Sequence, residues 1–496
     1  MQDAAGGKTL SELGFTGKSG ANPFITGLAV DSRNVKEGFL FAALPGAKIH
    51  GGEFIQYALR MNAAAILTDR EGAEIAKDEL AASDATLIVV DDPRQSLAYA
   101  AALFFGGQPE VMIAVTGTNG KTSVSSFARQ IWMKLGIMGA NLGTTGVEGA
   151  FEKPLNHTTP EPITLHGTLA EMKAAGITHA SMEASSHGLD QKRLDGVQLN
   201  VAGFTNFTQD HLDYHHTFEA YFDAKMGLFE RVLPDGAMAV INIDDPMGQN
   251  VVDRAQRAGA TIVTVGRHKN ASLYIENQRC DETGQDIRFH WLGEVYQTRL
   301  NLIGDFQADN VMLAAAMVIA SGVNAEQVFK VLPELETVRG RMEHAATRDN
   351  GAPIFVDYAH TPDAVKTALR SMRPHVMGRI IAVVGAGGDR DPIKRPLMGE
   401  AAAQNADVVF VTDDNPRTEN PISIRKMVMD GCPEGIEVGD RAEAILRAVD
   451  ALQAGDALLI AGKGHETGQI VGDQVLPFDD VEQASIAVEA LEGRLG

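Results

Sequence analysis

A glycine-rich stretch, TGTNGKTS, follows the apolar run VMIAV and gives the strongest chemical signal in the sequence. Glycines allow backbone N–H groups to curl round an anion, and a helix N-terminus behind them adds partial positive charge. Lys121 can then reach the β- and γ-phosphates of a nucleotide, and the Thr122 hydroxyl can bind Mg²⁺. A full phosphate-loop pattern would also need a glycine at position 115, where this chain has Val115. The order of strand, loop and helix nevertheless predicts an ATP-dependent site for phosphoryl transfer. Its predicted ATP-binding residues are Gly117, Thr118, Asn119, Gly120, Lys121, Thr122 and Ser123.

Two further stretches bring histidines and carboxylates together between apolar segments. SMEASSHGLDQKR contains Glu183, and NFTQDHLDYHH contains Asp210, His211, Asp213 and His215. Mg²⁺ takes few protein ligands and keeps several waters, so one or two of these groups would be enough to hold it. Each histidine alone is more typical of a surface or hydrogen-bonded residue, and the clustering makes the two interpretations about equal.

Lys225 lies four residues after Tyr221 on an expected helix. The spacing alone favours a surface lysine whose stem lies along the helix and whose ammonium reaches water.

The last third of the chain has polar loops directly after apolar runs. PIFVDYAHTPDAV places Asp357 and His360 at a strand end, and GAGGDRDPIKRP places Arg390 beside a glycine loop that can approach a ligand closely. An ion-paired surface arginine is the alternative for Arg390. TDDNPR carries Arg417 on a turn of Asp, Asn and Pro. GKGHETGQ lacks the order of a phosphate loop and is interpreted as a substrate loop with Glu466 as an acceptor.

The elements that must position these loops are short strands alternating with helices. Apolar runs at 63–68, 85–90, 111–117, 379–385, 406–412 and 457–462 suit strands buried on both faces. Their alternation with helical segments predicts an α/β fold with mostly parallel sheets. After the first glycine loop, Val124, Phe127, Ile131 and Leu135 recur at helical spacing, which predicts a helix packed on one face.

Length and composition limit the possible partners. A chain of 496 residues predicts roughly three domains, and FFGGQPE and ELETVRGRME suggest boundaries that give 1–106, 107–336 and 337–496. The net charge of −22 without a basic run argues against nucleic acid and anionic membranes. There is no export signal or 18-residue apolar span, so we expect a cytoplasmic protein. Cys280 and Cys432 are far apart in sequence and favour two inert thiols.

Together these strings resemble the Mur ligases. The resemblance rests on DSRNVKEGFLFAALPG, TGTNGKTS, MEASSHGLDQKR, DHLDYH, AKMGLF, GDFQADNVMLAAA, VRGRME, DYAHTPD, GAGGDRD, DDNPRTENP and AGKGHE, which occur in the family's order over essentially the whole chain. It implies an N-terminal UDP-sugar domain, a central P-loop-type ATPase domain with a mostly parallel sheet, and a C-terminal Rossmann-like domain for the incoming amino acid. It further implies ATP and Mg²⁺ as cofactors and peptidoglycan precursor synthesis, hence cell shape and division, as the role. We also expect a monomer that handles only small-molecule substrates.

The resemblance also implies roles for individual residues. Lys121, Lys225 and His211 would be catalytic, and Lys225 would carry CO₂ as a carbamate. Thr122, Glu183, His211 and the carbamate would hold Mg²⁺, and Asn310, Arg341, Asp357 and His360 would surround the nucleotide. The UDP-sugar contacts would be Val30, Ser32, Gly46, Ala47, Lys48, Thr158, Thr159, Ser185, Gln191 and Arg193. A meso-diaminopimelate site would consist of Arg390, Asp414, Asn415, Pro416, Arg417, Gly462 and Glu466. Two positions depart from the family pattern: His157 stands beside the expected Asn–Thr run, and Gly468 stands where an aromatic residue is frequent.

The expected reaction activates the D-glutamate γ-carboxyl of UDP-N-acetylmuramoyl-L-Ala-D-Glu as an acyl phosphate, which the amine of meso-diaminopimelate then attacks. A related Mur-type ligase or a folylpolyglutamate synthetase is one alternative, although the DSR and DNPR regions argue against the latter. A P-loop regulatory NTPase without ligase activity is an alternative of another class.

Overall fold

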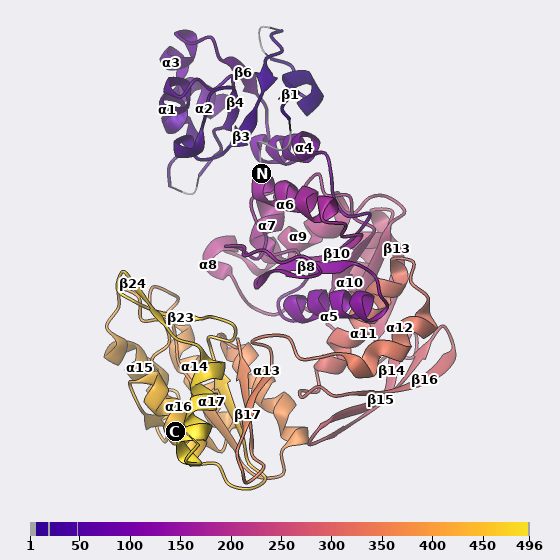
Figure 1. Cartoon of the computed structure of the whole chain (residues 1–496), viewed down its shortest axis with the longest axis vertical. Coiled ribbons are helices and arrows are strands. Elements are labelled where there is room, and N and C mark those ends of the chain that lie inside the picture. The colour runs from indigo at the N-terminus through magenta and orange to yellow at the C-terminus, as the bar shows by residue number, and fades with distance from the viewer. Residues whose placement is uncertain (1–5, 18–19, 47, 495–496) are drawn as a thin grey trace.

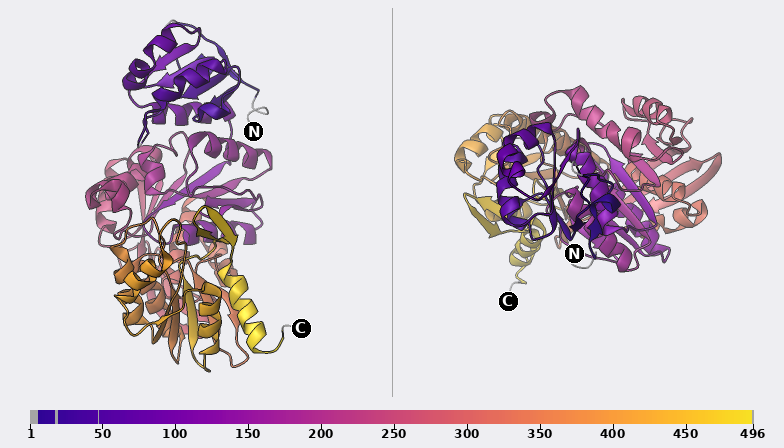
Figure 2. Two further views of the ribbon diagram at one scale, coloured as in Figure 1. Left: turned by 90° about the vertical axis from the view of Figure 1, so that its left-hand side faces the viewer. Right: turned by 90° about the horizontal axis from the view of Figure 1, so that it is seen from above.

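The computed structural model describes residues 6–17, 20–46 and 48–494, apart from the side chain of Asp213, and forms three α/β parts stacked along the long axis (Figure 1). Figure 2 shows the first part at one end of the second and the third part at the opposite end. Within the described residues, no helix has the length and apolar character needed to cross a bilayer.

The N-terminal part is built on a parallel sheet in the order β3-β4-β5-β6. Its strands are β3 (Gly27–Ala29), β4 (Phe39–Ala42), β5 (Ala65–Thr68) and β6 (Thr86–Val89). Helices α1 (Ile55–Arg60), α2 (Arg70–Ile75) and α3 (Lys77–Ala81) accompany it, and a short ribbon pairs β1 (Lys8–Thr9) with β2 (Phe24–Ile25). Helix α4 (Pro93–Phe105) begins after Asp92, whose carboxylate accepts a hydrogen bond from the Gln95 N–H. It packs against α6 (Pro162–Ala174) of the central part.

The central part is a ten-stranded sheet in the order β16-β15-β14-β13-β12-β11-β7-β10-β8-β9. The strands β7 (Val111–Thr116), β8 (Gly139–Gly143), β10 (His179–Glu183), β11 (Val201–Phe204), β12 (Met238–Asn242) and β13 (Thr261–Gly266) are parallel. Strand β9 (Gly146–Gly149) and the ribbon β14 (Leu273–Asp281), β15 (Gly284–Trp291) and β16 (Glu294–Leu300) add antiparallel pairs at the two edges. The helices are α5 (Lys121–Lys134), α6 (Pro162–Ala174), α7 (Ser186–Asp190), α8 (Leu212–His215), α9 (Phe218–Gly227), α10 (Gly248–Arg257), α11 (Gln307–Ala320) and α12 (Ala325–Val331).

The C-terminal part has a six-stranded sheet in the order β17-β18-β22-β19-β20-β21. Strand β17 (Glu343–Thr347) is antiparallel, whereas β18 (Pro353–Asp357), β19 (Ile380–Val384), β20 (Val408–Val411), β21 (Ile436–Glu437) and β22 (Ala457–Ala461) are parallel. Its helices are α13 (Pro362–Met372), α14 (Lys394–Asn405), α15 (Pro421–Met429), α16 (Arg441–Asp450) and α17 (Asp480–Leu491). A separate hairpin of β23 (Gly468–Val471) and β24 (Gln474–Pro477) comes after the loop that begins at Gly462.

The structure confirms the predicted α/β class, and a strand lies within every apolar run used to predict one. The helix after the glycine loop differs in one respect. Helix α5 is buried on more than the face marked by Val124, Phe127 and Ile131, because Ser125 and Ser126 are buried as well. Helix α11 lies beside α5 on the sheet and packs against these apolar side chains, whereas Ser125 faces the sheet and is hydrogen-bonded to Ser181 of β10.

The C-terminal part contains a fully buried ion pair whose loss should be measurable. Arg441 and Asp480 are completely buried, with Nη2–Oδ2 and Nε–Oδ1 distances of 2.7 Å each. Asp480→Ala should lower the free energy of unfolding by about 3–5 kcal/mol, because it leaves a buried guanidinium without its counter-charge. Denaturant unfolding measures this loss, and adding Arg441→Met should restore much of the stability. A double variant as unstable as the single one would contradict the explanation.

Candidate active site

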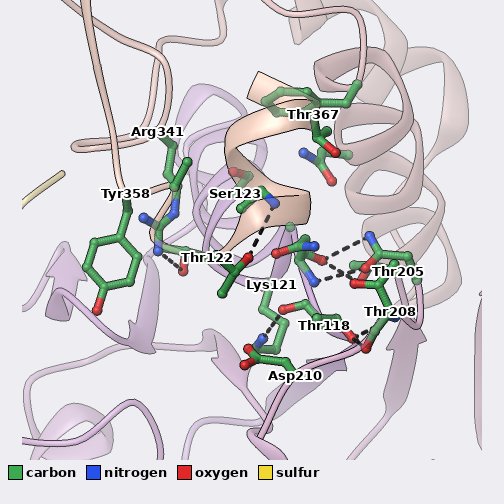
Figure 3. A pocket seen from close by; sticks show the side chains of 18 of the residues that line it. Thr118, Lys121, Thr122, Ser123, Thr205, Thr208, Asp210, Arg341, Tyr358 and Thr367 are labelled. Carbon is green, nitrogen blue, oxygen red and sulfur yellow. Dashed lines mark hydrogen bonds between the residues drawn. The ribbon is translucent and has the colours of Figure 1, made fainter. Parts of the chain in front are cut away.

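A cavity of about 420 Å³ lies where the central and C-terminal parts meet. It is lined by the glycine loop before α5 and by the carboxyl ends of β10 and β18, together with residues of α9, α11 and α13. Parallel sheets present their ligand sites beyond these strand ends. The close view in Figure 3 shows side chains of both parts, including Lys121, Asp210 and Arg341, around this cavity.

The glycine loop has a backbone that only glycine adopts easily at two points. Gly117 has φ 147° and Gly120, the N-cap of α5, has φ 85°. A Cβ on Gly120 would lie 2.5 Å from Asn310 Oδ1, so the close packing also excludes a side chain. Lys121 donates to the carbonyl oxygens of Gly117 and Thr118 at 3.0 and 2.8 Å. The loop therefore has the curved form that can hold a phosphate.

Thr122 and Glu183 place two oxygen ligands side by side in the cavity. Thr122 Oγ1 donates to Glu183 Oε2 at 3.0 Å, and Glu183 Oε1 accepts from the Thr144 N–H at 2.8 Å. Within the described residues, no group of three His, Cys, Asp or Glu side chains is close enough to hold a metal. Mg²⁺ binds through one or two protein oxygens together with substrate phosphates and water, so this donor pair suits it.

His211 also lines the cavity, but it is held in a strained backbone. Its φ is 52°, in the left-handed region, and its ring centroid lies 4.8 Å from that of His187. Burial lowers the pKa of His211 to about 4, so its imidazole is neutral near pH 7 and able to bind a metal. Asp210 is one of the clustered carboxylates that the sequence offered as possible metal ligands without assigning it a role. Its Oδ1 accepts a hydrogen bond from Lys394 Nζ of the C-terminal part at 3.3 Å. Burial alone would raise the pKa of Asp210, but His211 and Lys394 hold it below its ordinary value.

Lys225 is buried, which makes the expectation of a surface lysine from helical spacing wrong. Its side chain is 1% exposed, and Nζ donates to the Gly117 carbonyl at 2.7 Å. Burial, reinforced by the charge of Lys121, lowers the pKa of Lys225 well below its ordinary value. A neutral amine is the form that reacts with CO₂, so the environment suits a carbamate.

All four residues expected round the nucleotide line the cavity: Asn310, Arg341, Asp357 and His360. Arg341 lies over the Tyr358 ring at 4.6 Å and donates to Thr122 Oγ1 at 3.3 Å, so it joins the two parts (Figure 3). Asp357 accepts from the Met342 and Ala359 N–H groups at 2.8 Å each, and burial raises its pKa.

The residues expected to bind a UDP sugar fall into two groups. Thr158 and Ser185 line the cavity, while Arg193 Nη1 donates to the Thr159 carbonyl at 2.7 Å and its Nη2 to Gln191 Oε1 at 2.8 Å. In the N-terminal part, Val30 and Ser32 follow β3, and Gly46 and Lys48 follow β4, at the same edge of the sheet. Ala47 lies outside the described residues. His157, the position that departs from the family pattern, is exposed.

Arg94, which was not predicted from the sequence, lies near both groups. It lies in the first turn of α4 and donates to the carbonyl of Pro45, next to Gly46. Burial, and to a lesser degree the charge of Arg94, lowers the pKa of Arg193. Thr144 and Tyr358 were missed as well. Thr144 lies outside the quoted motifs, and Tyr358 lies within DYAHTPD but was given no role, because only the fold brings its ring to the cavity beside Arg341.

The residues expected to bind diaminopimelate form a second cluster, and none of them is among the described residues that line the cavity. Arg417 has φ 50°, and its Nη1 donates to the Gly388 carbonyl at 2.8 Å. A Cβ on Gly387 would lie 2.8 Å from Arg417 Nη1 and 3.7 Å from Arg390 Cγ, so this glycine allows the two arginines to approach. Asp414, Asn415 and Pro416 are buried in the turn, and a Cβ on Gly462 would lie 2.5 Å from Asp414 Oδ2.

Within the described residues, neither Arg390 nor Arg417 has a carboxylate partner. The alternative interpretation of Arg390 as an ion-paired surface residue is therefore wrong. Two guanidinium groups directed to one loop can bind the carboxylates of a ligand.

Three α/β domains with a phosphate-type loop at a domain junction define the class: a multidomain nucleotide-dependent enzyme. Three family profiles match consecutive segments: "Mur ligase family, catalytic domain" at residues 24–105, "Mur ligase middle domain" at 115–318, and "Mur ligase, glutamate ligase domain" at 340–464. The chain belongs to the Mur ligase family.

Similar proteins extend over nearly the whole chain. A UDP-N-acetylmuramoyl-L-alanyl-D-glutamate--2,6-diaminopimelate ligase of Brucella melitensis biotype 1 is 48% identical, covering 94% of both chains. A ligase with the same name from Caulobacter vibrioides is 46% identical, covering 98% of this chain and 99% of its own. A solved structure of a ligase of that name has a TM-score of 0.69 at 34% identity, covering 95% and 96%. A Mycobacterium tuberculosis folylpolyglutamate synthase complexed with ADP has a TM-score of 0.63 at 19% identity, covering 81% of this chain and 95% of its own, which shows only that the fold is shared.

Lys121→Ala should reduce nucleotide-dependent turnover by about 10³-fold or more, because a cation on the phosphoryl oxygens is lost in the transition state. The measurement is nucleotide turnover, with circular dichroism and the thermal midpoint as folding controls. Lys134→Ala, at the far end of the same helix, is the matched control and should keep full turnover. Near-normal turnover by a folded Lys121→Ala protein would exclude the phosphate contact.

Proposed function

We propose that the chain is an ATP-dependent, ADP-forming ligase that joins meso-diaminopimelate to the D-glutamate γ-carboxyl of UDP-N-acetylmuramoyl-L-Ala-D-Glu in peptidoglycan precursor synthesis. The names of the relatives at 46–48% identity support the reaction. The observation that carries the amino-acid substrate is the pair Arg390 and Arg417, which have no carboxylate partner in the described chain.

The position of Arg417 suits the distal carboxylate of this amino acid. Meso-diaminopimelate differs from lysine by one carboxylate on its distal carbon. Bonds from Nη1 to the carbonyls of Gly388 and Asn415 fix the Arg417 guanidinium, and its Nε and Nη2 N–H groups can grip both oxygens of a carboxylate. Arg390 then serves the carboxylate common to all amino-acid substrates. The chain has a net charge of −22. Two arginines at one site without a carboxylate partner among the described residues are therefore suited to binding a ligand with two carboxylates.

The proposed mechanism begins at the phosphate loop. A carboxylate is a poor electrophile, and transfer of the γ-phosphoryl group of ATP to the D-glutamate γ-carboxyl gives an acyl phosphate that an amine can attack. Lys121 and Arg341 stabilise the charge that develops on the phosphoryl oxygens. The amine of diaminopimelate attacks the acyl carbon, a tetrahedral intermediate forms, and phosphate leaves. Closure of the three domains over the site would exclude water, which would otherwise hydrolyse the acyl phosphate.

Mg²⁺ would be held by Thr122, Glu183 and His211, with the carbamate of Lys225 as a further oxygen ligand, and it would neutralise the phosphate oxygens. The direct contact of Thr122 with Glu183 and the neutral state of His211 support this donor set. The lowered pKa and burial of Lys225 support the carbamate.

We further propose that the UDP sugar binds between the N-terminal and central parts, with Ser32, Gly46 and Lys48 on one side and Thr158, Thr159, Ser185, Gln191 and Arg193 on the other. The position of Arg94 near both groups supports this placement. The proposed domain boundaries fall after residues 106 and 336, and the matched profiles lie within them. The proposed working form is a cytoplasmic monomer.

The decisive assay measures ADP release with substrates omitted one at a time. A ligase releases ADP only when both the UDP-sugar peptide and diaminopimelate are present. A regulatory NTPase would hydrolyse nucleotide without the amino acid, and a folylpolyglutamate synthetase would require a folate and glutamate instead.

Arg417→Ala should lower kcat/KM for diaminopimelate by about 10³-fold, because a bidentate pair of charge-assisted hydrogen bonds contributes roughly 1.5–3 kcal/mol per bond. Wild type should use lysine very poorly, and the KM for ATP should not change. The matched control is Arg447→Ala, an exposed arginine on α16 paired with Glu443. Equal use of lysine by wild type, or unchanged selectivity in Arg417→Ala, would refute the role of this turn.

Lys225→Ala should lose most ligase activity, and short carboxylic acids should restore part of it by replacing the carbamate oxygens near Mg²⁺. The measurement is ADP release with and without added acid. Lys121→Ala serves as the comparison, because a carboxylate cannot replace a lost cation. Failure of every acid tested, together with a wild-type mass that contains no bound CO₂, would argue for a plain lysine.

A further inference from the structure

Lys463, directly after Gly462 in the substrate loop, is completely buried. Its Nζ donates to the Gly468 carbonyl at 2.6 Å, to Asn415 Oδ1 at 3.2 Å and to Glu466 Oε2 at 3.3 Å. An ammonium has three N–H donors, and here each one meets an acceptor. A fully buried cation with this arrangement has a structural purpose, because burying it without these partners would be costly.

The acceptors belong to the two segments expected to bind the amino acid. Asn415 lies in the turn that carries Arg417, and its Nδ2 donates to Glu466 Oε2 at 2.9 Å. Its Oδ1 also accepts from the Ile470 N–H at 2.9 Å, so the whole Asn415 amide is committed to the substrate loop. The ammonium of Lys463 therefore connects the turn, the loop and the start of β23.

The same connection reaches Arg417 through the backbone. The Arg417 N–H donates to the Ile470 carbonyl at 3.0 Å, and the Gly472 N–H donates to the Arg417 carbonyl at 2.7 Å. Strand β23 of the hairpin thus pairs with the backbone of Arg417 and helps to hold this residue in its left-handed conformation.

We propose that Lys463 is a positioning residue that sets the selectivity for the amino-acid substrate; this inference rests on the proposed function. It fixes Glu466 through Oε2 and leaves Oε1 to accept from a substrate ammonium, while it holds the turn that carries Arg417. Glu466 and Arg417 would then be held in fixed relative positions, as a substrate with both a distal ammonium and a distal carboxylate requires. Lys463 itself touches neither the reacting atoms nor the nucleotide cavity.

The test compares Lys463→Met, which keeps the length of the stem and removes the ammonium, with wild type in the full chain. The KM for diaminopimelate should rise about 10- to 100-fold, since a displacement near 1 Å has effects of this size. The KM values for ATP and for the UDP-sugar peptide should stay within about twofold, because the network does not reach the cavity.

Two further variants separate positioning from a general loss of stability. Arg348→Met removes a mostly buried cation of the same domain, which contacts the Val449 carbonyl and Glu492, and it should leave all three KM values unchanged. Lys463→Gln keeps a donor that can reach part of the network, so it should raise the KM for diaminopimelate less than Lys463→Met does. It also carries the test if Lys463→Met does not fold.

The outcomes distinguish this inference from the proposed function. A folded Lys463 variant with a wild-type KM for diaminopimelate would overturn the positioning role while the ligase function stands. Equal increases in all three KM values would also overturn it, because a structural defect predicts that pattern. A wild-type chain that does not consume diaminopimelate would overturn both.

Discussion

One carbonyl oxygen, that of Gly117, accepts hydrogen bonds from two lysines, Lys121 at 3.0 Å and Lys225 at 2.7 Å. Two ammonium groups this close repel each other, and burial adds a further cost. Burial is the main cause of the lowered pKa of both lysines; the charge of Arg341 adds to it at Lys121, and the charge of Lys121 adds to it at Lys225. A bound polyphosphate would supply negative charge beside the buried ammonium of Lys121. A carbamate would turn the amine of Lys225 into an anion. The site is therefore built for a ligand that supplies negative charge in a chain that has a large excess of it elsewhere.

The sheets place the charged groups of the cavity with little freedom. The glycine loop with Lys121 directly follows β7, and Glu183 and Asp357 are the last residues of β10 and β18. Loops at such positions begin from a rigid backbone, and glycines at 117 and 120 allow that backbone to bend tightly. The same device recurs in the C-terminal part, where Gly387 makes room for Arg417 beside Arg390. In both the glycine loop and the proposed amino-acid site, a glycine thus allows the backbone to lie close to a cation.

The sequence was sufficient to predict the strands and the phosphate loop, because each depends on local patterns. About half of the described residues that line the cavity were expected, and some of these, such as Asn310 and Arg341, only from the resemblance to the Mur ligases. Continuous apolar runs identify buried strands, and a glycine loop between strand and helix has a distinct composition. Residues that act through tertiary packing could not be found in this way. Helical spacing placed Lys225 at the surface, whereas contacts with Tyr221 and the distant Gly117 bury it. Arg94 lies outside the quoted motifs, and Lys463 lies within AGKGHE without an assigned role; the importance of both follows only from partners that the fold brings to them.

The two ligand sites are connected by residues that cross the domain junction. Arg341 reaches Thr122 of the glycine loop, and Lys394 reaches Asp210 beside His211. Lys394 begins α14, and Arg390 lies four residues earlier on the glycine-rich loop before it. A movement of this loop when an amino acid binds would change the contact with Asp210, and a change at Asp210 would alter the charge next to His211. Because a coupling free energy is reciprocal, a nucleotide that orders the central site must then favour the loop position that binds the amino acid.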